Sequence, residues 1–134
     1  MTHPIVILQA ALVAALRADT ELAALVGAAI FDAPPQGAEA PYVAIARHDL
    51  LPRDGDAAPG FEHRITFHVW AAEPSRRAVL AMAERVLAVV LAMELDGELR
   101  LTLRQHERTD TAIDLNTGRA RAAVAVRVFS EASA

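Results

Sequence analysis

The chain has 134 residues, no cysteine, a formal charge of −4 and a pI near 5.7. This length suits one domain over residues 1–134 with its own core, and the lack of cysteine excludes disulfides, thiolate zinc sites and thiol catalysis. The acidic balance argues against a general nucleic-acid binder. No apolar run reaches the roughly 18 residues of a membrane span and no basic signal-peptide start is present, so we expect a soluble, cytoplasmic protein.

A first helix is predicted from Pro4 to Ala18. Apolar residues recur there at helical spacing, and a proline in the first turn costs no hydrogen bond. Thr2 or His3 would act as the N-cap.

A second, short helix is predicted directly afterwards. Asp19 suits its N-cap and Gly27 its end. Residues 28–40 hold a Pro-Pro pair and a glycine, which predicts an extended connector without a regular element.

Two strands follow, over residues 42–48 and 62–70. In the second strand apolar and polar side chains alternate, so one face of it should be buried. Residues 50–60 between the strands are rich in proline, glycine and charge, which predicts a mobile loop that becomes ordered on assembly. The charged residues singled out in this loop are Arg53, Asp54 and Asp56.

A long helix is predicted from about Ser75 to Met93. Ser75 suits the N-cap, and Gly97 lies just past the last periodic residues, where a C-terminal glycine is expected. We expect this helix to cover the apolar face of the preceding strand. The predicted core pairs Ile65, Phe67 and Val69 with Val79, Ala83, Val86 and Val90.

The last part of the chain reads as a second hairpin. Residues 98–106 alternate, with Leu99, Leu101 and Leu103 expected on one side, and the strand could extend through Thr111. After a turn at residues 116–118, a final strand is predicted over residues 119–129, followed by a polar tail from Ser130.

The order of elements indicates an α+β fold. We predict a mostly antiparallel four-stranded sheet with helices packed on one face, in the order α(α)ββαββ. A ferredoxin-like arrangement is the nearest alternative topology.

The residues with chemical potential form no recognisable catalytic, metal or cofactor site. His63 and His68 are an odd number apart on a strand, so they should point to opposite faces and cannot share a metal ion. The histidines are therefore expected at the surface or its rim. The serines lack a nucleophile elbow, and the glycines form no phosphate-binding motif. No catalytic, metal-binding or cofactor-binding residue is predicted.

The predicted last hairpin carries a stripe of arginines among carboxylates. It could be an ordinary mixed-charge solvent face or a polar interface between subunits. The arginines are Arg100, Arg104, Arg119, Arg121 and Arg127, and the nearby acids include Glu98, Glu107, Asp110 and Asp114.

Three stretches resemble a known protein family. The run of residues 16–35, followed by Ala40-Pro41-Tyr42-Val43, resembles the opening of the tail-terminator, or tail completion, proteins of tailed phages and gene transfer agents. Residues 62–70 are similar to the second strand of those proteins. The resemblance, with the helix that follows, covers about the first two-thirds of the chain, while the final hairpin matches only in pattern.

The resemblance implies a structural protein without enzymatic activity or cofactor. Such proteins cap the end of the tail tube, usually as a hexameric ring, and give the head-tail connector or stopper protein a surface to join. The implied partners are further copies of the chain, the tail tube protein and the connector, while DNA passes through the ring without specific binding and no membrane is involved. The expected location is the cytoplasm during assembly and then the head-tail junction of the particle.

Two other classes remain open at the level of sequence. One is a small ferredoxin-like ligand-binding or regulatory module, and the other is a hydrolase or transferase whose residues meet only in three dimensions. A six-fold ring with an open centre would favour the tail protein, whereas a closed dimer with a concave pocket would favour the others.

Overall fold

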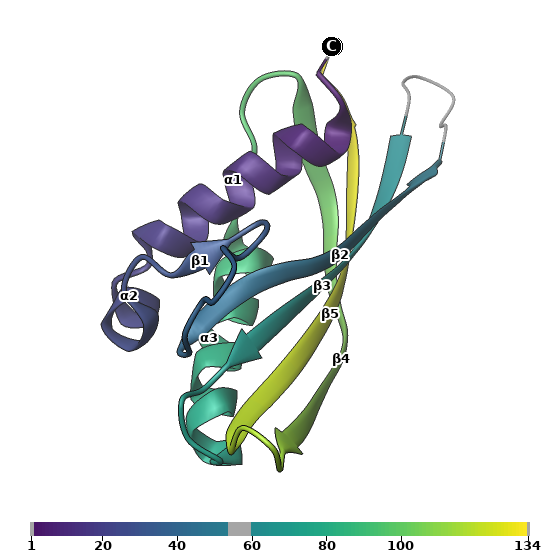
Figure 1. Ribbon diagram of the computed structural model, residues 1–134. Coiled ribbons are helices and arrows are strands. Elements are labelled where there is room, and N and C mark those ends of the chain that lie inside the picture. Colours follow the sequence, from purple (N-terminus) through teal and green to yellow (C-terminus); the bar gives the residue numbers. More distant parts are fainter. Residues whose placement is uncertain (1, 54–59, 134) are drawn as a thin grey trace.

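The computed structural model describes residues 2–53 and 60–133, in which three helices cover one face of a five-stranded sheet (Figure 1). The sheet order is β1-β2-β3-β5-β4, and every neighbouring pair is antiparallel except β1 and β2. No helix in these residues is long and apolar enough to cross a membrane. The elements are α1 (Pro4–Ala18), α2 (Thr20–Val26), β1 (Ile30–Phe31), β2 (Tyr42–Pro52), β3 (Gly60–Trp70), α3 (Arg76–Ala92), β4 (Leu99–Asp114) and β5 (Arg119–Ala132).

The α+β prediction with a mostly antiparallel sheet is confirmed. The two hairpins, β2–β3 and β4–β5, join through their second strands, because β3 pairs with β5 along eleven residues of each strand. This order of elements differs from the βαββαβ order of the ferredoxin-like alternative.

The helix starts form as the sequence predicts. The His3 Nδ1 atom accepts a hydrogen bond from the amide of Ile5, and the Asp19 carboxylate accepts one from the amide of Leu22. Gly27 ends α2 with a φ of 62°, a conformation that favours glycine.

The start of α3 is also confirmed, and so is its end near Met93, but Gly97 is not the glycine that closes the helix. The Ser75 hydroxyl accepts a hydrogen bond from the amide of Ala78, as expected for an N-cap. The C-cap is Met93 with a φ of −71°, so Gly97 does not close the helix. Gly97 instead takes a φ of 107° in the connection to β4.

The predicted core between β3 and α3 is confirmed. Phe67 is fully buried, and it belongs to one cluster of apolar side chains that reaches from the sheet to α1 and α3. The cluster contains every residue of the predicted pairing: Ile65, Phe67, Val69, Val79, Ala83, Val86 and Val90.

A fifth strand corrects the predicted count of four. Ile30 and Phe31 pair in parallel with Val43 and Ala44, so the connector at residues 28–40 is not wholly irregular. Ile30 is fully buried, and its carbonyl accepts a hydrogen bond of 2.8 Å from the Arg17 guanidinium. Burial and this bond hold a strand that is too short to show a periodic pattern.

The first hairpin is longer than predicted. β2 continues to Pro52 and β3 begins at Gly60, so residues 50–52 belong to a strand and not to the predicted loop. The amide of Arg53 donates a 2.7 Å hydrogen bond to the carbonyl of Gly60, and a Cβ atom on Gly60 would clash with the Arg53 carbonyl. The remainder of the predicted mobile loop, residues 54–59, lies outside the described residues.

Two register shifts in β4 overturn its predicted alternation. One lies between Leu101 and Leu103, and the other lies between His106 and Arg108. Such bulges change which side chains face the core. Leu103 consequently pairs with Phe129 on the face opposite the helices and is 50% exposed, while Leu99 stays buried.

Candidate interaction surface

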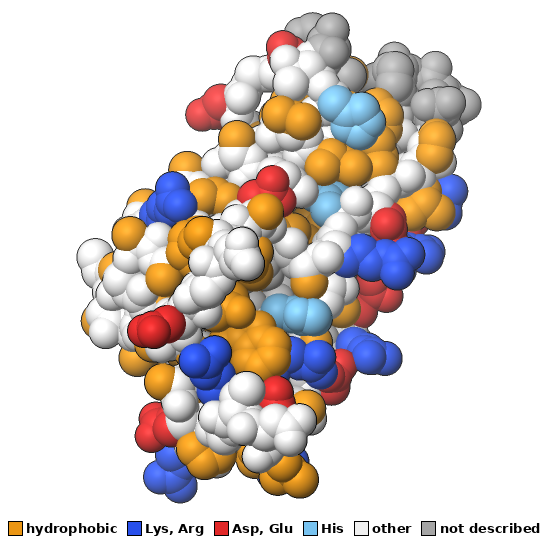
Figure 2. Space-filling view, viewed as in Figure 1, with side chains coloured by type: hydrophobic (Ala, Val, Ile, Leu, Met, Phe, Trp, Pro, Cys, Tyr) orange, Lys and Arg blue, Asp and Glu red, His pale blue; other side chains and the backbone are white. Residues whose placement is uncertain are grey.

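The face of the sheet opposite the helices, called the open face below, carries most of the predicted arginine stripe. Arginine and acidic side chains alternate along the right-hand side of Figure 2, over the strands. Alternation and strand register place the following charged residues on it: Arg47, Asp49, Glu62, Arg64, Arg100, Arg108, Asp110, Asp114, Arg119, Arg121, Arg127 and Glu131. Arginines therefore outnumber carboxylates there, although the whole chain is acidic.

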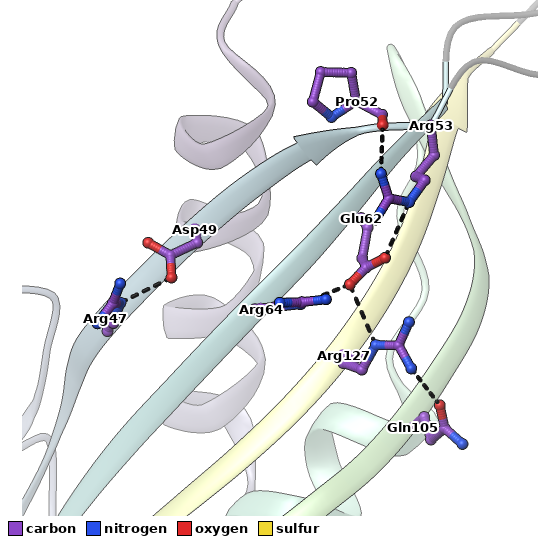
Figure 3. Close-up of polar contacts among 8 residues, drawn as sticks. All are labelled: Arg47, Asp49, Pro52, Arg53, Glu62, Arg64, Gln105 and Arg127. Atoms are coloured by element: carbon purple, nitrogen blue, oxygen red, sulfur yellow. Dashed lines mark hydrogen bonds and ion pairs between the residues drawn. The ribbon is translucent and has the colours of Figure 1, made fainter.

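Glu62 is the centre of the main cluster on the open face (Figure 3). Its side chain is only 1% exposed, and one carboxylate oxygen lies 2.7 Å from Nε of Arg64 and 3.3 Å from Nε of Arg127. The other oxygen lies 3.3 Å from Nε of Arg53. Three guanidinium groups thus surround one carboxylate, so the cluster has an excess of positive charge.

These contacts also set the ionisation of the cluster. Hydrogen bonds from Arg127 and Arg64 lower the pKa of Glu62 to about 2, against the opposing effect of desolvation. The same pairing raises the pKa of Arg64. Glu62 therefore stays ionised at neutral pH, and each guanidinium keeps donors that the single carboxylate does not use.

A second cluster lies nearer the turn between β4 and β5. The Asp110 carboxylate lies 2.9 Å from the Arg108 guanidinium and 3.4 Å from that of Arg121. Arg127 of the Glu62 cluster does not belong to it; that side chain lies over the ring of Phe129, 5.3 Å from its centroid. Arg121 and Asp110, two members of the predicted interface, thus already pair within one chain.

The remaining predicted residues divide between the two faces. Arg100 pairs with Glu131 on the open face, and Arg119 lies opposite Asp114 in the register of β4 and β5. Arg104 is on the helix side, because the first register shift of β4 turns it there, and it pairs with Glu94 at 2.7 Å. The prediction that all five arginines share one face is therefore wrong for Arg104.

Of the three charged residues predicted in the mobile loop, only Arg53 lies within the described residues. Arg53 belongs to the Glu62 cluster, a contact that the sequence does not predict. Asp54 and Asp56 lie outside the described residues. Glu107 lies within the second register shift of β4.

A row of hydrogen-bonded polar side chains, buried at His63 and Ser130, crosses the helix side of the sheet. Nε2 of His48 lies 2.8 Å from Nδ1 of His63, and Nε2 of His63 lies 2.9 Å from the Ser130 hydroxyl. The Gln9 side chain of α1 lies 3.5 Å from the other ring nitrogen of His48. This row of hydrogen bonds therefore connects α1 to β2, β3 and β5.

This row of hydrogen-bonded side chains corrects two expectations from the sequence. His63 is fully buried and not at the surface, and Ser130 is a buried residue of β5 and not the start of a polar tail. Burial lowers the pKa of both His48 and His63 to about 4, so both rings are neutral at neutral pH. The phase of the strand could have revealed His63, because it alternates with Ile65 on the buried face. His68 lies on the other face, as predicted.

The contact between His63 and Ser130 does not make a catalytic site. Ser130 is 3% exposed, and the second nitrogen of His63 is bound to another histidine instead of a carboxylate. Among the described residues, no three histidine or acidic side chains are grouped so that they could hold a metal ion. The chain of hydrogen bonds is best explained as an internal polar connection.

Comparison with known proteins identifies a family. A sequence model described as "Tail completion protein gp17" matches residues 10–131. A chain of the solved "Virion of native gene transfer agent (GTA) particle" is similar to this one, with a TM-score of 0.85 and 27% identity over 98% of this chain and 99% of that chain. A search of curated proteins finds no match.

Proposed function

Because the chain belongs to the tail completion protein gp17 family, we propose that it closes the end of a tail tube as a hexameric ring and joins that tube to the head. The family consists of structural virion proteins and not of enzymes. In this proposal, the tail tube and the head belong to a tailed phage or a gene transfer agent particle. The proposed location is the cytoplasm during assembly and the head-tail junction afterwards.

One observation carries this proposal. The similar chain belongs to the virion of a native gene transfer agent particle, and the similarity covers almost the whole of both chains. A match of this extent includes both hairpins and all three helices, so it concerns the complete fold and not a shared motif. The proposed partners are further copies of the chain, the tail tube protein and the head-tail connector or stopper protein.

The open face supports assembly through polar contacts. A sheet with only one face covered leaves the other available, and guanidinium groups can bind the carboxylates of a neighbour with two hydrogen bonds each. Contacts of this kind let the subunit remain soluble before it assembles. In the proposed ring, DNA passes through the centre without specific binding, which agrees with the acidic charge of the chain.

Electron microscopy of particles assembled with and without this protein tests the proposal. With the protein present, we expect tails of finished length joined to heads, and the purified protein mixed with tail tubes should form six-fold rings at one tube end. Without it, heads and tails should remain separate. Normal particles in its absence, or binding along the sides of the tubes, would contradict the proposed role.

A further inference from the structure

We propose that each subunit of the ring binds the next one head to tail, with the Glu62 cluster of one copy against an acidic connector of its neighbour. The acidic connector is the segment 93–98 between α3 and β4, whose exposed acids are Glu94, Asp96 and Glu98. This inference rests on the proposed ring and specifies which two surfaces form its interface.

Positive and negative charge lie on different surfaces of one chain. The open face has more arginines than carboxylates, although the chain as a whole has a charge of −4, so the rest of its surface is acidic. The exposed acids of the helices and connections include Glu21, Glu73, Glu84, Glu94, Asp96 and Glu98. A second copy therefore offers the charge that complements the open face.

This charge pattern also restricts the symmetry of a contact between two copies. Two open faces placed against each other by a two-fold axis would bring arginine clusters together, which like-charge repulsion disfavours. A contact between the open face and the helix side joins two different surfaces, and repetition of such a contact gives a ring when the rotation closes. The charge pattern thus favours a ring over a closed dimer.

The position of the connector along the strands selects it among the acidic segments. Glu62 lies opposite Phe129 of β5, and the carbonyl of Glu98 accepts a hydrogen bond from the amide of Ser133 at the same end of that strand. Four residues of strand separate these levels, about 13 Å. The carbonyl of Glu73, by contrast, binds the amide of Ala120 at the far end, about 30 Å from the level of Glu62. If the strands run along the ring axis, the rotation that relates neighbouring subunits does not change the height of a residue along that axis. The acidic connector of the next copy then lies near the height of the Glu62 cluster, whereas its Glu73 does not.

Both surfaces have unused capacity for this contact. Arg64 bonds to Glu62 through Nε, and its side chain is still 50% exposed, so its terminal nitrogens can bind a carboxylate from outside. Among the described residues, Asp96 and Glu98 have no ion-pair partner, whereas Glu94 is paired with Arg104. Asp96 and Glu98 are therefore the acids expected to meet the cluster.

The test reverses charges on exposed residues and measures ring formation by sedimentation and microscopy. Asp96→Arg with Glu98→Arg should raise the protein concentration needed for half-maximal assembly about tenfold or more, and so should Arg64→Glu. A chain carrying all three changes should recover assembly, because the reversed charges again complement each other. Glu73→Arg, at the far end of the sheet, is the matched control and should assemble like the wild type.

The outcomes separate this inference from the proposed function. If the wild type forms no ring alone or on tail tubes, the proposed function fails and the inference with it. If the wild type forms rings and the connector variant forms them equally well, only the inference is wrong. Rings that survive connector reversal, combined with weaker binding of duplex DNA by Arg64→Glu, would instead place the arginines at the lumen. Circular dichroism on each variant checks that it is folded, and failure of the folded triple variant to recover assembly would also refute the pairing.

Discussion

The pair of His48, which is partly buried, and His63, which is fully buried, should make the protein lose stability as the pH falls below neutrality. Burial lowers both folded-state pKa values to about 4, whereas a histidine in an unfolded chain titrates near 6.5. Between these pH values the unfolded chain binds more protons than the folded one, so the free energy of unfolding falls as the pH falls. The neutral pair thus contributes its full stability only above about pH 6.5.

The size of the effect follows from the difference in pKa. At pH 5.5 the unfolded histidines are about ten times more often protonated than neutral, while the folded ones remain neutral, which corresponds to about 1 kcal/mol for each ring relative to pH 7. For the two rings together, the free energy of unfolding should therefore fall by about 2 kcal/mol between pH 7 and pH 5.5. Asp19 and Glu62 do not obscure this window: their pKa values are lowered by arginine partners, so the stability they contribute is lost only below about pH 4.5. Burial also lowers the pKa of His68, so His68 adds a loss of the same sign to the wild type and to the double variant alike.

Urea unfolding at pH 7.0 and pH 5.5 measures the effect. The wild type should lose about 2 kcal/mol between the two pH values, and the double variant His48→Gln with His63→Gln should lose much less, whatever its stability at pH 7.0. His106→Gln, at an exposed position on β4, is the matched control and should lose as much as the wild type. Equal stability of the wild type at both pH values, or a full loss in the double variant, would refute the reasoning.

Three further predictions concern the core, the edge strand and the open face. Phe67→Ala should cost about 3 to 5 kcal/mol in urea unfolding, because it leaves a cavity in the core, and a loss below about 1 kcal/mol would mean that the side chain is not buried. Leu99→Ala should cost about 2 kcal/mol or more and Leu103→Ala under about 1 kcal/mol, and equal losses would contradict the register shift in β4. Arg121→Glu with Arg127→Glu should weaken ring formation on tail tubes in light scattering, and a folded variant that assembles with wild-type affinity would show that these arginines only face solvent.

The parts of the fold that the sequence predicts are those fixed by local chemistry. The start of each helix follows from a capping side chain, such as Ser75, that binds an amide two or three residues away. The core follows from the spacing of apolar residues along the sequence, which shows directly which side chains share a face of a helix or strand. These signals need no knowledge of what lies next to the segment, so the sequence predicts both Pro4–Ala18 and Arg76–Ala92 to within a residue or so at each end.

The errors fall where a distant partner decides the conformation. Ile30–Phe31 becomes a strand only because β2 is beside it, and the shifts in β4 depend on how that strand aligns with β5. The same dependence limited the prediction of the surface. Glu62 and Arg64 share a face by their spacing, which the sequence reveals, but the approach of Arg127 depends on the register of β3 and β5.

The structure of the Glu62 cluster bears on how assembly can be controlled. A buried carboxylate without partners would destabilise the free subunit, and the neighbouring copy would then have to be present for folding. Here the partners of Glu62 come from its own chain. The open face can therefore stay hydrated in the isolated subunit, and ring formation exchanges water on the spare guanidinium donors for carboxylates of the next copy. Because such exposed charge pairs are screened by salt, assembly should depend on both protein concentration and ionic strength, while folding of the subunit should depend on neither.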